Sequence, residues 1–467
     1  MCGLRPLQGS VPGARLHPYG NHRLRRFPLN FTLKDITAVT LSERGILERS
    51  SILVKDGIIS EVGDFEKLKA LLPGAEVIDG GGKIALPGFI NAHTHLYSSL
   101  ARGMPIKGAP SSFREILELI WWKLDRVLEP EDIYLSALVG LIDAVRCGVT
   151  SLIDHHASPN YIRGSLDLIE RAVREVGLRA VLSYEVTDRN GKKGALEGIE
   201  ENVRFARKVR DDDKIRASFG LHASFTLSTE TLKLCREAES DLNVGFHIHV
   251  AEGIEDLEDS LKKYGMRTVE RLDREGILKD RSLLIHTVHI DKSEIDIIEK
   301  RGVSTVHNPS SNMNNAVGYP PLPAMLKRGL KVGLGTDGYT QHVLGEMRAA
   351  IILMRHATGN PSIGYPQAYS MFFENNPAIL GQFFGGKFGK LEKGYRADFI
   401  LVDYSPPTPF TDDNLLGHLV FGFLPLKVTD VFVGGKAVMR DGKLTNIDEA
   451  SVLERARIRA REIWRRL

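Results

Sequence analysis

Cysteine is scarce in this sequence: the 467 residues contain only three, Cys2, Cys147 and Cys235. They lie far apart and form no Cys-x-x-Cys pair. This spacing excludes a disulfide framework and a cysteine-ligated metal site, because both need paired or clustered cysteines. It is typical of a reduced protein, so we expect a cytoplasmic location.

Long apolar runs and a strong net charge are also missing. No stretch of 18 or more apolar residues occurs, which predicts that the chain does not span a membrane. Lysine and arginine outnumber aspartate and glutamate by 62 to 59, which gives a net charge of +3. So small an excess argues against nucleic acid or an anionic membrane as a partner.

The first thirty residues are basic and rich in glycine and proline. They lack the apolar segment of a secretory signal, so we interpret residues 1–30 as a disordered or dispensable arm. A targeting role is the alternative for this segment.

Short β-strand patterns occur near both ends of the chain. Residues 31–86 alternate apolar and polar positions, with Asp56 and Gly57 placed as a hairpin turn. The same alternation of apolar and polar positions occurs again over residues 391–449. Neither segment is long enough to bury a good sheet alone, because a stable sheet needs three or more strands with a covered face. We therefore predict that the two segments pair as one composite β-sandwich domain.

Between these ends, apolar runs alternate with helical patterns. The eight runs begin at residues 85, 148, 178, 214, 244, 282, 302 and 331. Several helical patterns stop at a glycine, such as Gly177 or Gly302, which suits a helix C-cap. Eight strand-then-helix units predict an α/β fold, a parallel (β/α)8 TIM barrel over residues 87–390. Residues 450–467 are predicted to form an amphipathic helix that docks on the body.

Nearly every apolar run ends in polar residues that can perform chemistry. His93 and His95 close the first run. The titratable residues at the later ends are Asp154, His155, His156, Glu185, His222, His249, Glu252, His286, His289 and Asp337. In such a barrel the carboxyl ends of the strands form the active site. Residues two apart in a strand point the same way, so His93 and His95 face the barrel axis together.

These residue types predict a divalent metal site. A lone His-x-His pair is weak evidence, since it can be a pair of hydrogen-bonded polar residues. His249, His286 and Asp337, at the ends of later strands, strengthen the evidence for a metal site. A catalytic metal site needs a few imidazole and carboxylate ligands and one open position. Such a metal lowers the pKa of a water molecule to about 7 and so provides hydroxide. We expect Zn²⁺, with Fe²⁺ as the alternative, and the ligand types suit both.

Hydrolysis also needs a group that moves protons, and Glu252 is the candidate. It lies three residues after His249, where strand becomes loop, and it could carry a proton from the water to a ring nitrogen. Nucleobase deaminases use a glutamate that is not a metal ligand in this way. The alternative is an exposed loop residue or a charge at a helix start. His247 faces the same way as His249 but lies about 6–7 Å deeper, so we interpret it as a buried, hydrogen-bonded residue beneath the site.

The motifs "PGFINAHTH", "HIHVAE", "IHTVH", "HNPSSN" and "GTDG" resemble those of the amidohydrolase superfamily, in order and at the matching strands. In its mononuclear members four such residues bind the metal, which implies His93, His95, His249 and Asp337 here. The resemblance further implies that His286 hydrogen-bonds the hydroxide or the substituent of the attacked carbon, that Glu252 shuttles the proton and that Asp337 assists. Binuclear members carry a carboxylated lysine at the fourth strand, where this chain reads "ASFGLHAS", so one metal is implied.

A narrower likeness rests on "WWKLDR", "DHHASPNYIRGSLD", "EVTDRN", "SNMNNAVGY" and "FGKLEKGYRADF". These segments are similar to the aminohydrolases called SsnA, which are associated with purine-related molybdenum hydroxylase pathways. The "DHH" stretch is similar to the 8-oxoguanine and triazine hydrolase branch. The likeness covers residues 31–445.

Four residues are candidates for substrate contact: His222, Trp122, Asn312 and Arg189. His222 matches a position that touches substrate in the deaminase branch, and a hydrogen-bonded core histidine is the alternative. Trp122 falls in the long segment after the first strand, where it either stacks on a flat ring or packs a helix. Asn312 and Arg189 are able to hydrogen-bond a polar ring.

The sequence therefore predicts a metal-dependent aminohydrolase that deaminates a small, purine-like nitrogen heterocycle. Hydrolytic ring opening of a cyclic amide or amidine at the same site is the alternative reaction. A hypothesis from another class is a non-catalytic barrel that binds a purine or a metal as a partner of a molybdenum hydroxylase. A homodimer is expected from the resemblance alone.

Overall fold

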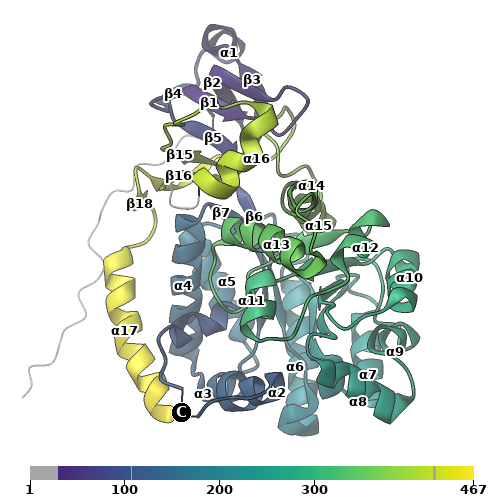
Figure 1. The fold of residues 1–467 in the computed structure, drawn as a ribbon. Coiled ribbons are helices and arrows are strands. Elements are labelled where there is room, and N and C mark those ends of the chain that lie inside the picture. The colour runs from purple at the N-terminus through teal and green to yellow at the C-terminus, as the bar shows by residue number, and fades with distance from the viewer. Residues whose placement is uncertain (1–29, 107, 424–426) are drawn as a thin grey trace, which may run out of the picture.

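The computed structural model describes residues 30–106, 108–423 and 427–467. The predicted N-terminal arm lies outside this part of the chain, apart from Asn30. The described residues form a barrel of parallel strands wrapped in helices, with a mixed sheet at one end and one long helix along the side (Figure 1).

Strands from both ends of the chain form one mixed sheet of nine strands. The strands are β1 (Phe31–Val39), β2 (Ile46–Lys55), β3 (Ile58–Gly63), β4 (Glu76–Asp79), β5 (Ile84–Pro87), β15 (Phe399–Val402), β16 (Val428–Val433), β17 (Lys436–Arg440) and β18 (Lys443–Leu444). β5 joins the two halves, because it pairs with β1 on one side and with β15 on the other. The sheet encloses a core of its own, in which the rings of Phe399 and Phe432 stack at 4.5 Å. The prediction that both chain ends build one β domain is confirmed.

Eight strand positions form the barrel, as the alternation of the sequence predicted. They are β6 (Phe89–Thr94), β7 (Val149–His156), β8 (Arg179–Tyr184), β9 (Ile215–Ala217) with β10 (Phe219–Ala223), β11 (Phe246–Val250), β12 (Leu283–His286), β13 (Ser304–His307) and β14 (Val332–Leu334). The strands pair in parallel as two sheets, one from β6 to β9 and one from β10 to β14. The fourth position is split at Ser218, so that β9 pairs with β8 while β10 pairs with β11.

Buried asparagine side chains close the two seams between these sheets. Asn376 donates to the backbone carbonyl groups of Ile90 in β6 and Leu334 in β14, at 2.7 and 2.9 Å. At the other seam, the amide of Asn202 bonds to the backbone of β8 and of β10. Each amide adds to the few backbone hydrogen bonds at its seam, such as Thr336 N to His93 O and Val186 N to Gly220 O, so the two sheets are joined on both sides.

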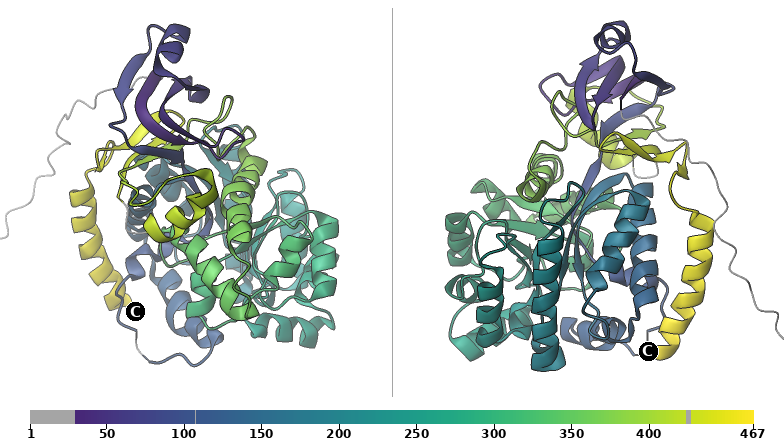
Figure 2. Two further views of the ribbon diagram at one scale, coloured as in Figure 1. Left: turned by 45° about the horizontal axis from the view of Figure 1, so that its top comes forward. Right: turned by 180° about the vertical axis from the view of Figure 1, so that it is seen from behind.

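Helices surround the barrel and cover its strands (Figure 2). The helices of the described residues are α1 (Phe65–Leu71), which packs on the mixed sheet, and α4 (Pro130–Arg146), α5 (Ser165–Val176), α6 (Gly191–Lys208), α7 (Thr229–Glu239), α8 (Ile254–Tyr264), α9 (Thr268–Arg274), α10 (Lys292–Arg301), α11 (Pro309–Asn314), α12 (Leu322–Lys327), α13 (Val343–Thr358), α14 (Tyr365–Tyr369), η5 (Ser370–Asn375), α15 (Asn376–Phe384), η6 (Asp412–Asn414), α16 (Leu415–Gly417), η7 (His418–Gly422) and α17 (Glu449–Arg466). Gly177 and Gly302 end α5 and α10 with φ values of 100° and 64°, the left-handed backbone of a glycine C-cap. The two glycine stops of the sequence are therefore helix ends.

One segment crosses the barrel opening at the end away from the mixed sheet (Figure 1). It follows β6 and comprises η1 (Leu96–Ala101), α2 (Phe113–Ile116), the π-helix η2 (Leu117–Trp121) and α3 (Trp122–Val127). We call residues 113–127 the cover segment. Short turns η3 (Asp188–Asn190) and η4 (Ser224–Thr226) follow β8 and β10 at the same end. A π-helix is uncommon and occurs frequently at functional sites, which draws attention to this segment.

The C-terminal helix α17 docks along α4 (Figures 1 and 2). The buried carboxylate of Asp132 in α4 accepts hydrogen bonds from Arg459 and Arg466, at 2.8 and 2.5 Å. Trp464 Nε1 donates to the carbonyl group of Leu100 in η1 at 3.0 Å. Through these contacts α17 fixes the start of the segment that crosses the barrel opening.

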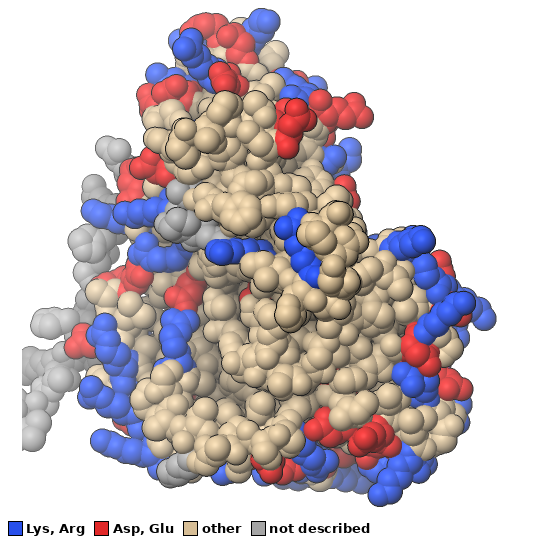
Figure 3. All heavy atoms as spheres, in the orientation of Figure 1, with Lys and Arg blue, Asp and Glu red and all other residues tan. Residues whose placement is uncertain are grey.

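Charged side chains of both signs are mixed over the surface. Figure 3 shows them mainly over the end sheet and along the outer edges of the barrel, with an uncharged area between. This mixture is the structural counterpart of the small net charge. No helix among the residues that the structure describes combines the length and the apolar content that crossing a bilayer would require.

Candidate metal centre and active site

Four strand ends bring the candidate metal ligands to one place. His93 lies in β6 and His95 directly after it, His249 lies in β11, and Asp337 follows β14. His286 is the last residue of β12. Each of the four imidazoles is less than a tenth exposed, and the Asp337 side chain is 13% exposed. These five side chains therefore lie in the barrel at the carboxyl ends of its strands, where this fold places its active sites.

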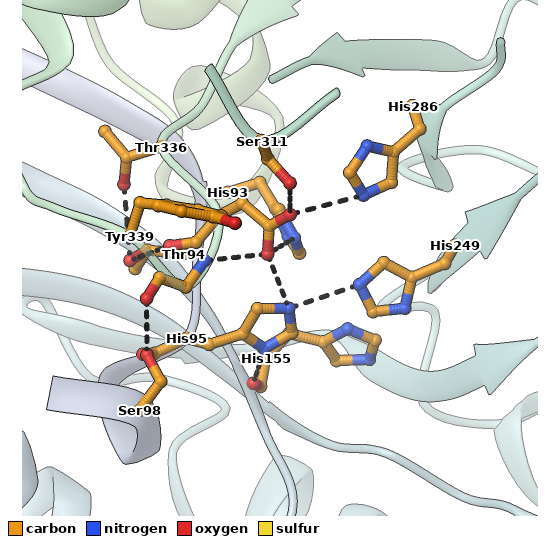
Figure 4. A network of polar contacts seen from close by, with 12 residues as sticks. His93, Thr94, His95, Ser98, His155, His249, His286, Ser311, Thr336 and Tyr339 are labelled. Carbon is orange, nitrogen blue, oxygen red and sulfur yellow. Dashed lines mark hydrogen bonds and ion pairs between the residues drawn. The ribbon is translucent and has the colours of Figure 1, made fainter. Parts of the chain in front are cut away.

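The Asp337 carboxylate lies among the imidazoles. Its Oδ1 is 3.2 Å from His95 Nε2 and 3.8 Å from His93 Nε2. Its Oδ2 is 3.6 Å from His286 Nε2. Figure 4 shows the rings of His95 and His249 meeting edge to edge, with their Nε2 atoms 3.2 Å apart. Several nitrogen and oxygen atoms thus converge on one small space.

Backbone carbonyl groups determine which ring nitrogens carry the protons. His95 Nδ1 donates to the carbonyl oxygen of His155 at 2.6 Å, and His249 Nδ1 donates to that of His222 at 2.7 Å. A carbonyl oxygen only accepts, so each Nδ1 is protonated, and each ring presents the lone pair of Nε2 to the site when it is neutral. Partners of this kind orient metal-ligating histidines in proteins.

His247 lies beneath the group and contacts His93. It is fully buried, and its Nε2 is 2.9 Å from His93 Nδ1. Its ring also stacks on that of His155 at 4.2 Å. The contact with His247 turns His93 Nε2 toward Asp337, so His247 occupies the buried, hydrogen-bonded position that the sequence suggested.

The residues present fit a divalent cation. His93 Nε2 and His286 Nε2 are buried and make no hydrogen bond within the described ranges. Ligand atoms of His93, His95 and Asp337 lie within 4.8 Å of one another. Orphaned buried nitrogens are rare in proteins and need an explanation, and a bound ion supplies one. Imidazole and carboxylate ligands suit both Zn²⁺ and Fe²⁺.

Burial and charge shift the protonation of these groups. Burial, together with the charges of His95 and His286, lowers the pKa of His249 to about 3. Burial opposes a proton on His95, yet the hydrogen bond and charge of Asp337 raise the pKa of His95 to about 9. Burial likewise opposes the charge of Asp337, but its contacts with His95 hold the pKa of Asp337 well below the usual value. A proton on His95 therefore balances Asp337, and a divalent cation would release that proton.

Glu252 follows β11 and lies on the wall of the site beside His286. Its Oε2 is 3.4 Å from His286 Nε2, and its Oε1 accepts a hydrogen bond from Asn315 Nδ2 at 3.4 Å. Burial, followed by the charge of Asp337, raises the pKa of Glu252 well above its usual value. A carboxyl group with a raised pKa can both take up and return a proton near neutral pH.

The backbone is strained where these residues leave their strands. Ala251, His286, Thr287 and Asp337 have φ values of 48°, 73°, 48° and 56°. Residues other than glycine rarely adopt this left-handed conformation, and each instance costs about 1–3 kcal/mol. Strain of this kind concentrates at active sites, where the surrounding structure holds reactive groups in place.

A pocket of about 740 Å³, counted to its open mouth, lies over these groups. His95, His249 and Asp337 line its inner part, and Glu252 lines its wall. The cover segment contributes Phe113, Leu117, Trp121, Trp122 and Asp125. Aromatic and apolar walls around a few polar groups are typical of a site for a small molecule.

The candidate substrate contacts divide into two groups. His222, Trp122 and Arg189 line the pocket, and the rings of Trp122 and His222 lie 6.2 Å apart. Asn312 is not among the described residues that line it. Instead Asn312 is fully buried, and its Oδ1 accepts a hydrogen bond from His286 Nδ1 at 2.7 Å. The structure thus places Asn312 behind His286, as a residue that positions the imidazole.

Replacing Asn312 with alanine is expected to lower kcat about 10- to 100-fold with little change in KM. The reason is that the amide holds the ring of His286 without reaching the pocket. Steady-state kinetics over a range of substrate concentrations separates the two constants. A raised KM at unchanged kcat would instead put the amide in contact with substrate.

The paired histidines at the end of β7 take different places. His155 lies toward the site, with its ring 5.0 Å from that of His249. His156 points away and bonds to Ser158 Oγ at 2.8 Å. Glu185, at the end of the next strand, has Oε1 3.4 Å from His95 Nδ1. His95, His155, Glu185 and His249 also bring ligand atoms within 4.8 Å of one another, so this second candidate group shares His95 and His249 with the first.

Some functional neighbours carry no signal that the sequence analysis used. Ser311 Oγ donates to Asp337 Oδ2 at 2.5 Å. Asp256 accepts hydrogen bonds from the backbone of Ala251 and Phe225, at 2.7 and 2.9 Å, and so holds the turn that carries Glu252. Ser311 stands inside the motif "HNPSSN", and Asp256 falls in the first turn of α8, where a carboxylate is common. The motif was visible in the sequence, but the roles of these two side chains were not.

The fold and this site define a metal-dependent hydrolase built on a (β/α)8 barrel. The pattern of the amidohydrolase family matches residues 84–438. The chain belongs to the amidohydrolase family, as its motifs indicated.

Named relatives span nearly the whole chain. It is 33% identical to the 5-methylthioadenosine/S-adenosylhomocysteine deaminase of Syntrophomonas wolfei over 445 residues, which are 93% of this chain and 99% of the relative. It is 31% identical to the 5′-deoxyadenosine deaminase of Methanocaldococcus jannaschii, over 88% of this chain and 95% of the relative. The crystal structure of an adenosine deaminase from Xanthomonas campestris with bound zinc has the same fold, with a TM-score of 0.82, 24% identity, and coverage of 95% of this chain and 100% of that one. The narrower likeness to the SsnA aminohydrolases stays a prediction, since these relatives bear other names.

Proposed function

We propose that this protein is a metal-dependent aminohydrolase that removes the amino group of a purine-like heterocycle. The observation that carries the proposal is the position of Glu252, beside His286 and Asp337 on the wall of the pocket. A proton carrier next to a ligand set for a hydrolytic metal is the arrangement that deamination of a ring carbon needs. Adenine nucleosides are the first substrates to test, because the relatives named above are deaminases of that class.

His93, His95, His249 and Asp337 would hold the metal, and we propose a single Zn²⁺. The neutral rings of His95 and His249 offer Nε2 lone pairs, and Asp337 offers a charged oxygen. When bound, such an ion acts as a Lewis acid that lowers the pKa of water to about 7, so that hydroxide is available at neutral pH. Iron remains the alternative, since the ligands suit it equally.

Glu252 and His286 would supply the remaining chemistry. The Glu252 carboxylate takes a proton from the attacking water and returns it to the ring nitrogen next to the attacked carbon. Its raised pKa keeps the proton available for that return. His286, held by Asn312, hydrogen-bonds the substituent of the attacked carbon while ammonia leaves. Asp337, between His95 and His286, is placed to assist the second proton transfer, in which the remaining proton of the attacking water passes to the amino group that leaves as ammonia.

Release of ammonia tests the proposal. The purified protein, loaded with zinc, is incubated with adenosine, 5′-deoxyadenosine and 5′-methylthioadenosine, and then with other purines, pterins and triazines. We expect ammonia and the corresponding oxo product from at least one of them, and loss of turnover after treatment with a chelator. A ring-opened product without ammonia would favour the alternative hydrolysis. Absence of any turnover, with capture of a molybdenum hydroxylase, would favour the binding-partner hypothesis.

The proposal also includes a cellular location and an oligomeric state for the enzyme. A cytoplasmic location rests on the low number and wide spacing of the cysteines. A homodimer rests on family resemblance alone, and light scattering of the purified protein measures it.

A further inference from the structure

The short helix α11 and the residue that follows it present two polar side chains to the metal centre. Ser311 and Asn315 are four residues apart, so they are neighbours on one face of the helical turn. Asn315 Nδ2 donates to Ser311 Oγ at 3.3 Å, and Ser311 Oγ donates to Asp337 Oδ2 at 2.5 Å (Figure 4). Both side chains are buried. Asn315 therefore reaches the proposed ligand Asp337 through one hydroxyl group.

The same amide group also reaches Glu252. Asn315 Nδ2 donates to Glu252 Oε1 at 3.4 Å. The two hydrogens of the amide thus serve two acceptors, Glu252 Oε1 and Ser311 Oγ. Glu252 and Asp337 are the two carboxyl groups that the proposed reaction uses for proton transfer. One asparagine side chain therefore links both of them.

Tyr339 determines which way round this amide lies. Its hydroxyl group donates to Asn315 Oδ1 at 3.2 Å. Asn314 Nδ2 donates to the same hydroxyl oxygen, so the tyrosine has its own hydrogen left to give. The reverse orientation of the amide would place its oxygen against the Glu252 carboxylate and its nitrogen against that hydrogen. The nitrogen of Asn315 is therefore turned toward the carboxyl groups.

A donor at Oε1 leaves the other oxygen of Glu252 to carry the proton. The carbonyl oxygen of a protonated carboxyl group is a better acceptor than its hydroxyl oxygen, so the Asn315 donor favours a proton on Oε2. Oε2 is the oxygen that lies 3.4 Å from His286 Nε2. Without the amide the two oxygens become equivalent, and the carboxyl group is free to rotate away from His286.

α11 orients both side chains that the proposed mechanism places at the attacked carbon. Asn312 holds His286 from behind, and Asn315 holds Glu252 from the side. The two asparagines differ in one respect, because Asn315 lines the pocket and Asn312 does not. A direct contact between Asn315 and the substrate is therefore the alternative that an experiment has to separate.

We propose that Asn315 and Tyr339 are positioning residues for proton transfer. Tyr339 orients the amide of Asn315, and Asn315 holds Glu252 so that Oε2 is the oxygen that takes the proton from water and passes it to the ring nitrogen. Oε1 keeps its hydrogen bond to Asn315 throughout. The inference rests on the proposed function, since it assigns Glu252 the role of proton carrier.

Steady-state kinetics of single variants is the first test, with the substrate that releases ammonia fastest. Asn315→Ala should lower kcat about 10- to 100-fold, because a misplaced carboxyl group transfers protons less efficiently. Tyr339→Phe keeps the ring and should lower kcat about 3- to 10-fold, as expected for the loss of one hydrogen bond. KM should stay within a factor of two in both variants. Tyr365→Phe removes a hydroxyl group from α14, outside the lining of the pocket, and is the matched control that should keep kcat.

Double variants separate positioning from support of the fold. Because the tyrosine acts through the asparagine, Tyr339→Phe should cause no further loss in the Asn315→Ala protein. Because the asparagine acts through Glu252, Asn315→Ala should cause no further loss in the Glu252→Gln protein. Losses that multiply in both double variants overturn the inference, since independent structural damage has that effect. A raised KM at unchanged kcat also overturns it, because Asn315 would then contact the substrate.

Nuclear magnetic resonance of the zinc-loaded protein tests the contacts without turnover. With asparagine side chains labelled by ¹⁵N, the amide signal that disappears in Asn315→Ala belongs to Asn315. We expect that signal to shift when Tyr339→Phe removes one partner and when Glu252→Ala removes the other, and to stay in place in Tyr365→Phe. A signal that neither change moves overturns the inference. Shifts in both variants without ammonia release by the wild-type protein would uphold the contacts and sink the proposed deamination instead.

Discussion

Replacing Glu252 with glutamine is expected to lower kcat about 100- to 10,000-fold and to leave the metal content near one ion per chain. Glutamine keeps the size of the side chain and its contact with Asn315, but its amide cannot take up a proton at neutral pH. Glu252 is outside the proposed ligand set, so nothing in the change removes a metal ligand. Ammonia release and metal analysis on the same preparation measure both quantities.

Glu258→Gln is the matched control for this experiment. Glu258 belongs to α8, six residues after Glu252, and its side chain is exposed. The same loss of charge there should leave kcat within a factor of two, as expected for a surface carboxylate. Full activity of the Glu252 variant would show that Glu252 is not the proton carrier. Loss of metal from that variant would show that Glu252 is a metal ligand.

The candidate ligand positions were accessible from the sequence because they occur in short local patterns. His93 and His95 are two residues apart in one strand, and the pleat of the strand makes them face the same way. Glu252 follows His249 by three residues, at the point where β11 turns into a loop. In a barrel the end of every strand reaches the same rim, so each such pattern predicts a location as well as a residue.

The supporting contacts were not accessible, because they join segments that are distant in sequence. Asp125 and Arg189 are 64 residues apart, and Asn376 reaches Ile90 across 286 residues. No periodicity relates such pairs, and whether they meet depends on how distant elements pack together. The break of the fourth strand at Ser218 has the same origin, since it follows from the closure of the barrel.

Asn312 illustrates how a motif can predict a residue without predicting which group its side chain contacts. It stands in the segment after β13, where residues of a barrel commonly meet substrate. In the structure the helix α11 turns its amide toward His286 and away from the pocket. The direction of one short helix decides between the two roles, and composition or spacing does not encode that direction.

His249→Asn is expected to leave the protein with little bound metal, whereas His247→Asn should retain close to one ion per chain at saturating zinc. His249 presents its Nε2 lone pair 3.2 Å from His95 Nε2, at the centre of the ligand set. His247 contacts the ring of His93 from beneath and acts through it. Losing such an outer partner typically weakens metal affinity about 10- to 100-fold without abolishing binding.

The two variants control for each other, because the same substitution is made two residues apart in one buried strand. Zinc titration of the metal-free proteins gives the affinity, and metal analysis after gel filtration gives the stoichiometry. Thermal melting without zinc separates a loss of ligand from a loss of fold. Equal loss of metal in both variants would make His247 a ligand and place the ion lower in the barrel, among His93, His155 and His247, whose ligand atoms also lie within 4.8 Å of one another. Retention in the His247 variant alone places the ion at the level of Asp337, within reach of Glu252.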